Sequence, residues 1–108
     1  MGELYYIDKG LKELVIMWFQ DIEEQCTELT SGNISHKRPT INGIASRSKQ
    51  YIEEFEKDCE PTLHSKLIKY FSTIEDMADE LTTGNVAHKK AAIKGFACRA
   101  KEYLIKHT

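Results

Sequence analysis

The sequence predicts an all-α protein, an antiparallel four-helix bundle built from two tandem homologous helical hairpins with a pseudo-twofold axis. Residues 11–56 and 63–108 align without a gap at an offset of 52, with 18 identities in 46 positions. Apolar residues in both copies recur at steps of three and four, which indicates helices. A short turn within each copy makes its two helices antiparallel neighbours. A length of 108 residues fits a single domain, 1–108, with an acidic linker at 53–62.

The first helix of each copy is predicted from its start signal and its apolar stripe. Asp8 is a good N-cap residue, and Pro61 suits the first turn of the second copy. We expect two equivalent stripes to face the core: Leu11, Val15, Trp18, Ile22, Cys26 and Leu29 in the first copy, and Leu63, Leu67, Tyr70, Ile74, Ala78 and Leu81 in the second.

A Gly-Asn pair follows each of these helices. Gly32 and Gly84 stand where a left-handed residue often closes a helix. Asn33 and Asn85 are suited to cap the helix that follows.

The second helix of each copy starts after this turn. Pro39 is tolerable only within the first turn, which places that start near residues 35–38. The second copy has Ala91 there and is expected to begin one turn earlier. Their core faces should be Ile41, Ile44, Ala45, Ser48, Ile52 and Phe55, and then Ile93, Phe96, Ala97, Ala100 and Leu104.

Other arrangements of the hairpins are less favoured. A short solenoid would stack them, but two repeats are few, because each unit needs neighbours to bury its face. Two chains exchanging hairpins would preserve the same contacts.

Charge alternates along the chain. Residues 1–30 carry a net −5, residues 31–52 a net +4, and residues 83–108 a net +5. One interpretation is local compensation, in which Glu28 lies level with Lys37 and Glu80 with Lys89, and the lysines reach the last carbonyls of the preceding helix. The other is an anion-binding end where two helix N-termini meet basic groups. Its candidate residues are His36, Lys37, Arg38, His88, Lys89 and Lys90.

A second candidate surface runs along one side of each basic helix. Gly43 and Arg47 recur in the second copy as Gly95 and Arg99. Glycine inside a helix costs about 1 kcal/mol relative to alanine, which suggests that something approaches the backbone closely. Three interpretations compete: the two basic helices pack on each other through the glycines, a partner chain docks there, or histidine and arginine flank a small anionic ligand.

Catalytic chemistry is not indicated. The chain lacks nucleophile, phosphate-loop, zincin, EF-hand and di-iron motifs, so we expect no enzyme, cofactor or resident metal. A metal shared by His36 and His88 is much less favoured than two exposed histidines. Glu23 and Glu75 should lie at helix seams and meet a hydroxyl such as that of Thr30 or Thr82, without an opposed group for acid–base catalysis.

The cysteines, the N-terminal residues and the longest apolar run indicate the cellular location. Three widely spaced cysteines indicate reduced thiols in the cytoplasm, and residues 1–6 do not resemble a signal peptide. The apolar run Leu14–Phe19 is too short to span a bilayer. The segment Leu4–Ile7 either packs across the bundle or forms an exposed arm. We therefore expect a small regulatory protein that binds a protein partner, with self-association as one form, and with nucleic acid or a phosphorylated ligand as the weaker alternative.

Overall fold

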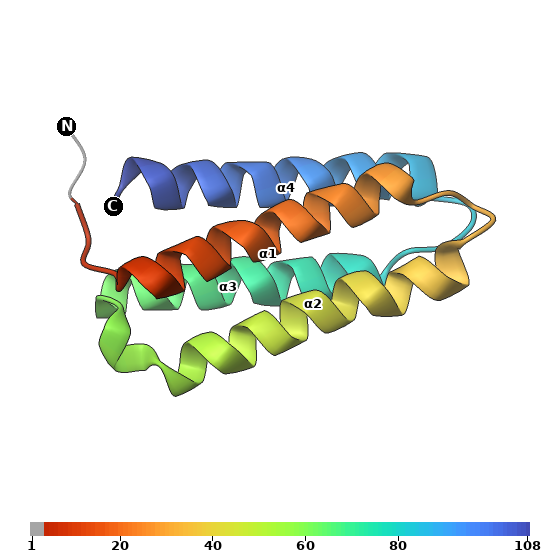
Figure 1. Ribbon diagram of the computed structural model, residues 1–108. Helices are drawn as coiled ribbons and strands as arrows, with labels where there is room; N and C mark the ends of the chain where they lie inside the picture. The colour runs from red at the N-terminus through yellow and green to blue at the C-terminus, as the bar shows by residue number, and fades with distance from the viewer. Residues whose placement is uncertain (1–3) are drawn as a thin grey trace.

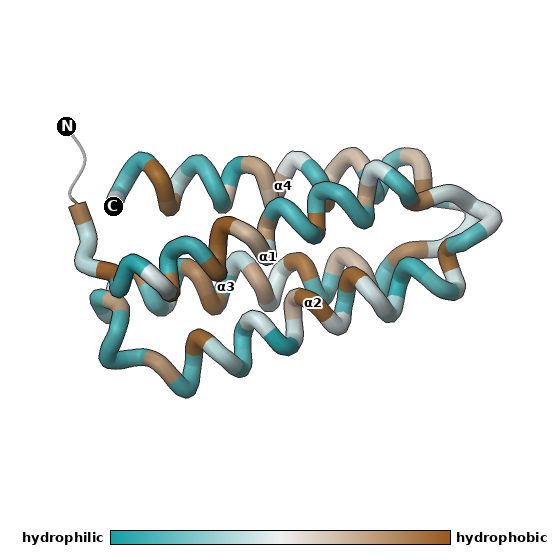
Figure 2. Tube along the Cα trace, viewed as in Figure 1, coloured by the Kyte–Doolittle hydropathy of each residue, from teal (hydrophilic) through white to brown (hydrophobic). Residues whose placement is uncertain are grey.

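The computed structural model describes residues 4–108 and is helical throughout that range apart from turns, a short 3₁₀ turn and one isolated β-bridge. Its four α-helices are α1 (Lys9–Glu28), α2 (Ile34–Glu54), α3 (Pro61–Asp79) and α4 (Val86–Lys106), and the 3₁₀ turn η1 (Glu56–Asp58) joins α2 to α3 (Figure 1). Hydrophobic residues recur at intervals along each helix, between hydrophilic ones (Figure 2). Among these helices, none has the length and apolar character needed to cross a membrane.

The helices form the predicted antiparallel four-helix bundle. α1 packs most closely on α4, and α2 most closely on α3, while the two helices of each hairpin touch more loosely. α2 and α4 therefore lie at opposite edges of the bundle (Figure 1), which is 41 Å long and wider in one direction, 29 Å, than in the other, 18 Å. Both Gly-Asn turns lie at the same end, the turn pole, as the pseudo-twofold arrangement requires (Figure 1).

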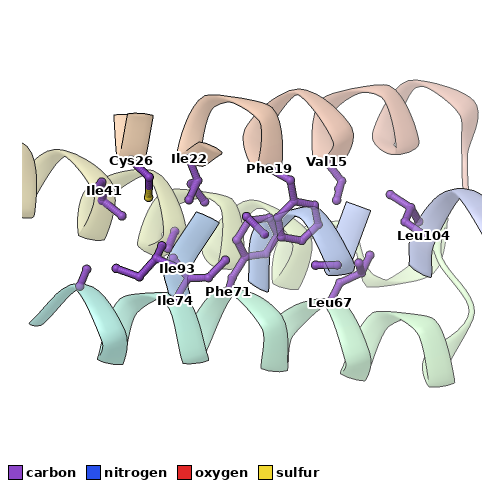
Figure 3. Packing of buried hydrophobic residues seen from close by; sticks show 14 of the residues in the cluster. Val15, Phe19, Ile22, Cys26, Ile41, Leu67, Phe71, Ile74, Ile93 and Leu104 are labelled. Atoms are coloured by element: carbon purple, nitrogen blue, oxygen red, sulfur yellow. The ribbon is translucent and has the colours of Figure 1, made fainter. Parts of the chain in front are cut away.

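Two phenylalanines occupy the centre of the core. Phe19 and Phe71 are fully buried and stack with ring centroids 4.5 Å apart and planes inclined by 6° (Figure 3). The prediction that Trp18 and Tyr70 point into the core is wrong in part, because both are only partly buried. Each is one residue, or about 100° of helix rotation, away from the buried phenylalanine, so it lies at the edge of the core.

The remaining predicted core positions are largely confirmed. Ile44, Phe96 and Phe55 are the exceptions in α2 and α4: the first two are partly buried and Phe55 is exposed. Ala45 and Ser48 are buried in α2, and Ala97 and Ala100 in α4. Their small size allows these helices to approach α3 and α1 closely.

The turns close differently from the prediction. Neither Gly32 nor Gly84 adopts a positive φ, so the left-handed closure is wrong. Asn33 Oδ1 instead accepts a hydrogen bond from the Thr30 N–H (2.8 Å), and its Nδ2 donates to the Glu28 carbonyl (2.9 Å). The second turn repeats both bonds through its equivalent asparagine. The asparagines occupy the N-cap positions of α2 and α4, as predicted, but their side chains bond the end of the preceding helix and not the start of the following one.

The starts of the helices follow the sequence more closely. Asp8 Oδ2 accepts from the Leu11 N–H (3.2 Å), and Pro61 is the first residue of α3, as predicted. α2 begins at Ile34, slightly before the predicted range, so Pro39 falls in its second turn. The missing proline N–H would have bonded the carbonyl of Ser35, an exposed residue that solvent can satisfy. α4 begins at Val86, directly after Asn85, which agrees with the early start expected for the second copy. The expected difference of one turn between the copies is wrong, because α2 begins at the equivalent position.

The N-terminal segment packs across the end of the bundle opposite the turn pole. Ile7 forms an isolated antiparallel bridge with Cys59 in the linker. The Asp8 N–H donates to the Asp58 carbonyl (2.7 Å), and the Tyr5 N–H donates to the His107 carbonyl (2.6 Å). These bonds decide between the two alternatives for residues 4–7 in favour of a packed segment.

Candidate functional site

Two lysines at the turn pole form the predicted local ion pairs. Lys37 Nζ lies 2.6 Å from Glu28 Oε1, and Lys89 Nζ lies 2.7 Å from Glu80 Oε1. Lys37 also donates to Gln25 Oε1 (2.8 Å). The carboxylates at the end of each first helix are therefore neutralised by the helix that follows.

The next basic residue in each copy reaches the other hairpin. Arg38 Nη1 donates to the Leu81 carbonyl (3.2 Å), and Lys90 Nζ donates to the Leu29 carbonyl (3.0 Å). Cations stabilise the C-terminal end of a helix, where carbonyls lack partners and the dipole is negative. The sequence predicts this role for Lys37 and Lys89, each within its own hairpin. In the structure the next residue along the chain, Arg38 or Lys90, takes the role and bonds a carbonyl of the other hairpin.

The glutamates at the seams also pair across the hairpins. Glu23 Oε1 lies 2.8 Å from Lys101 Nζ, and Glu75 pairs with Lys49 in the equivalent contact. The hydrogen bond that Lys49 donates to Glu75 raises the pKa of Lys49. The predicted threonine partners are therefore wrong, because a lysine of the opposite hairpin lies within reach of each carboxylate.

The remaining candidate residues lie on α2 and α4. We call His36, Gly43 and Arg47 the outward face of α2, and His88, Gly95 and Arg99 the outward face of α4; the histidines and arginines are exposed. Within residues 4–108, the side chains of these four residues make no ion pair or hydrogen bond. Because α2 and α4 occupy opposite edges, their outward faces point to opposite sides of the bundle (Figure 1). The two histidines therefore do not face one another across a shared site.

The helix-interior glycines lie directly beneath the arginines. A Cβ on Gly43 would be 3.0 Å from Arg47 Nη1, and one on Gly95 would be 3.4 Å from Arg99 Nη1. These guanidinium atoms, and not atoms of another helix, are the nearest neighbours. The interpretation that α2 and α4 pack on each other through the glycines is therefore wrong. The glycines leave room for each arginine to lie along its own helix.

A cavity opens at the seam of each hairpin, and the sequence reasoning missed both. The α1/α2 cavity is about 260 Å³ and the α3/α4 cavity about 240 Å³. The available signal was the aromatic residue at equivalent positions of the two copies, Trp18 and Tyr70, which we interpreted as core packing. The lining residues are Trp18, Asp21, Ile44, Arg47, Ser48 and Tyr51 in the first cavity, and Lys66, Lys69, Tyr70, Thr73 and Phe96 in the second.

Groups for metal binding or thiol chemistry are not assembled in the part of the chain that the structure describes. No three histidine, cysteine, aspartate or glutamate side chains there are placed to hold a metal ion. Burial raises the pKa of Cys26 to about 12 and that of Cys59 to about 11. Both thiols therefore stay protonated near neutral pH, and a protonated thiol is a poor nucleophile.

Comparison with protein-family models, with curated proteins and with solved structures finds no match to the chain. The ten predicted site residues divide into two groups. Four of them hold the turn pole together: Lys37, Arg38, Lys89 and Lys90. The other six form the two outward faces: His36, Gly43, Arg47, His88, Gly95 and Arg99.

Proposed function

We propose that this protein is a small, non-enzymatic binding or regulatory module of the cytoplasm, of the adaptor, inhibitor or immunity type. It docks a protein partner through the outward faces of α2 and α4. The observation that carries the proposal is the pair of exposed arginines, Arg47 and Arg99, which have no ion-pair partner within residues 4–108. A guanidinium offers a planar fork to carboxylates, and arginine is enriched at protein interfaces.

The surroundings of the arginines favour a docking surface over a catalytic one. Gly43 and Gly95 give Arg47 and Arg99 room to lie along the helix surface, where a partner can reach the guanidinium groups. Among residues 4–108, His36 and His88 find no carboxylate or carbonyl partner of the kind that orients a catalytic imidazole. Both features suit a surface that binds a partner protein without catalysing a reaction.

The alternative is a nucleic-acid or phosphorylated ligand at the turn pole. It receives less support, because a phosphate there would compete with Glu28 for Lys37 and with Glu80 for Lys89. The net charge of −2 also opposes a long polyanion. Phosphate-driven binding would weaken steeply with salt, which separates the two functions experimentally.

Affinity capture from the native host tests the proposal. The bait is the tagged full chain, and the test variant is Arg47→Glu/Arg99→Glu. The matched control is Lys9→Glu/Lys57→Glu, which makes the same change in charge at exposed positions away from both outward faces. We expect one protein to be retained by the wild type and the control and lost by the test variant, with all three baits equally helical by circular dichroism.

Two results would contradict the proposal. Equal capture by both variants would show that the outward arginines do not contact the partner. Recovery of nucleic acid that disappears at high salt would favour the alternative. A captured band consisting of the chain itself would identify the partner as a second copy.

A further inference from the structure

The two hairpin seams are equivalent in position but differ in chemistry. Lys66 and Lys69 line the α3/α4 cavity, and the residues 52 positions earlier are Leu14 and Met17. Thr73 also lines the α3/α4 cavity, and the equivalent residue of the first copy is Asp21, which lines the α1/α2 cavity. The lining of the α3/α4 groove contains cations and no carboxylate, whereas the α1/α2 groove has a carboxylate and fewer cations.

Aromatic rings line the floor and rim of the α3/α4 groove. Lys66 Nζ lies 5.8 Å from the centroid of the Tyr70 ring and 5.3 Å from that of Tyr103. Arg99 Cζ lies 5.8 Å from the centroid of the Phe96 ring. Lys66, Lys69 and Arg99 have no carboxylate partner among residues 4–108. The groove thus combines an apolar floor with two positive charges in its lining, Lys66 and Lys69, and a third beside it, Arg99, and residues 4–108 supply no counter-charge for them.

We propose that the α3/α4 groove binds an acidic segment of the partner protein. An apolar side chain of that segment lies on Tyr70 and Phe96, and its flanking carboxylates pair with the three cations. This deepens the proposed function and rests on it, because Arg99 belongs both to the outward face of α4 and to the rim of the groove.

The size of the groove favours a peptide segment over a free small molecule. Pockets for cofactors and drug-sized ligands usually measure about 300–1,000 Å³. The α3/α4 cavity, at about 240 Å³, holds one large side chain and leaves the rest of a ligand outside. A chain that inserts a single residue and extends along the surface fits this shape.

The α1/α2 groove does not share this specificity. Asp21 lines it and would repel a carboxylate, and Arg47 is the one cation in its lining. The positions equivalent to Lys66 and Lys69 hold Leu14 and Met17, which cannot pair with a carboxylate. Each chain therefore binds one acidic segment, although its two hairpins have the same fold.

A fluorescent peptide with one leucine among glutamates is the direct probe, with the glutamine version as its control. Fluorescence anisotropy at low and high salt gives the affinity, and amide chemical shifts of the full-length protein locate the site. We expect salt-sensitive binding of the acidic peptide alone, with shifts around Lys66 and Lys69. Lys66→Leu/Lys69→Met, which installs the residues of the first hairpin, should weaken binding by about tenfold because two exposed ion pairs are lost.

The first hairpin supplies the reciprocal test. Leu14→Lys/Met17→Lys/Asp21→Thr gives the α1/α2 groove the polar residues of its counterpart, at positions that are partly buried or exposed. We expect the number of peptides bound per chain to rise from one to two. This gain does not depend on any variant losing stability.

Several outcomes would overturn the proposal: no binding of the acidic peptide by the wild type, unchanged binding by Lys66→Leu/Lys69→Met, or tighter binding of ATP than of the peptide in the same groove. The proposed function is distinguishable from it. If Arg47→Glu/Arg99→Glu loses the captured partner while Lys66→Leu/Lys69→Met retains it, docking through the outward faces stands and the groove has no part in it.

Discussion

Replacing the helix-interior glycines by alanine should stabilise the protein. Gly43 and Gly95 are partly exposed, and the nearest atoms to an added Cβ belong to the ends of Arg47 and Arg99. A guanidinium at the end of a flexible side chain can move aside, so the intrinsic helix preference for alanine should dominate. That preference is about 1 kcal/mol per residue. We expect about 0.5–1 kcal/mol from Gly95→Ala, and somewhat less from Gly43→Ala, because its contact of 3.0 Å requires a larger displacement.

Urea unfolding followed by circular dichroism measures the effect. For a small domain whose free energy of unfolding falls by about 1–3 kcal/mol per molar urea, the double variant should raise the midpoint by roughly 0.5–1 M without a change in slope. Ala91→Gly, at an exposed position of α4, is the reverse control and should lower stability by about 1 kcal/mol. A loss of more than about 1 kcal/mol in Gly43→Ala or Gly95→Ala would refute the reasoning, because it would mean that another helix lies against the glycines.

Three further predictions concern a core ring, an ion pair between the hairpins and the thiols. Phe19→Ala should lower the free energy of unfolding by about 3–5 kcal/mol, measured in urea, because the ring is fully buried; a loss below about 1 kcal/mol would contradict its central place. The hydrogen bond to Glu75 raises the pKa of Lys49 above its ordinary 10.5, so the stability gained from the pair is full below that value and disappears as pH rises through the folded-state pKa. Thermal unfolding of Lys49→Met should therefore show a smaller decline with alkaline pH than the wild type, and parallel curves would contradict this. Cys98, which is only partly buried, should react with Ellman's reagent before Cys26, whose pKa is raised to about 12 by burial; Cys98→Ser should abolish the fastest phase.

Features set by local spacing were predictable from the sequence. The repeat determines that both turns have the same length, and the antiparallel hairpin then brings Glu28 level with Lys37. The cap at Asp8 and the place of Pro61 depend only on neighbouring residues. These features could be predicted without knowing how one hairpin packs on the other.

Contacts between the hairpins were not predictable in the same way. The pairing of Glu23 with Lys101 depends on how far one hairpin is rotated and shifted against the other, which helical periodicity does not specify. The choice between Trp18 and Phe19 for the core centre also depends on that rotation, since both lie near the apolar stripe. Arg38 was assigned to an anion site because its charge was visible in the sequence, whereas the carbonyl it meets was not.

Sequence pattern identified the outward residues of the candidate site and missed the grooves beside them. Arg47 and Arg99 were selected because each recurs, with a glycine four residues before it, at the same position of both copies. Lys66 and Lys69 were overlooked because they have no basic counterpart in the first copy, and repetition was the signal used to choose residues. A difference between copies is equally informative once the fold shows that the positions face the same kind of groove.

The reciprocal bonds between the hairpins have a consequence for the origin of the chain. Each hairpin supplies one donor to a helix-end carbonyl, one acceptor carbonyl, one seam lysine and one seam glutamate. A lone hairpin would therefore carry every group needed to associate with an identical molecule, in an isologous dimer. Fusing two such units makes their association independent of concentration. The two units can then differ in sequence, so that α3 carries Lys66 and Lys69 where α1 has Leu14 and Met17.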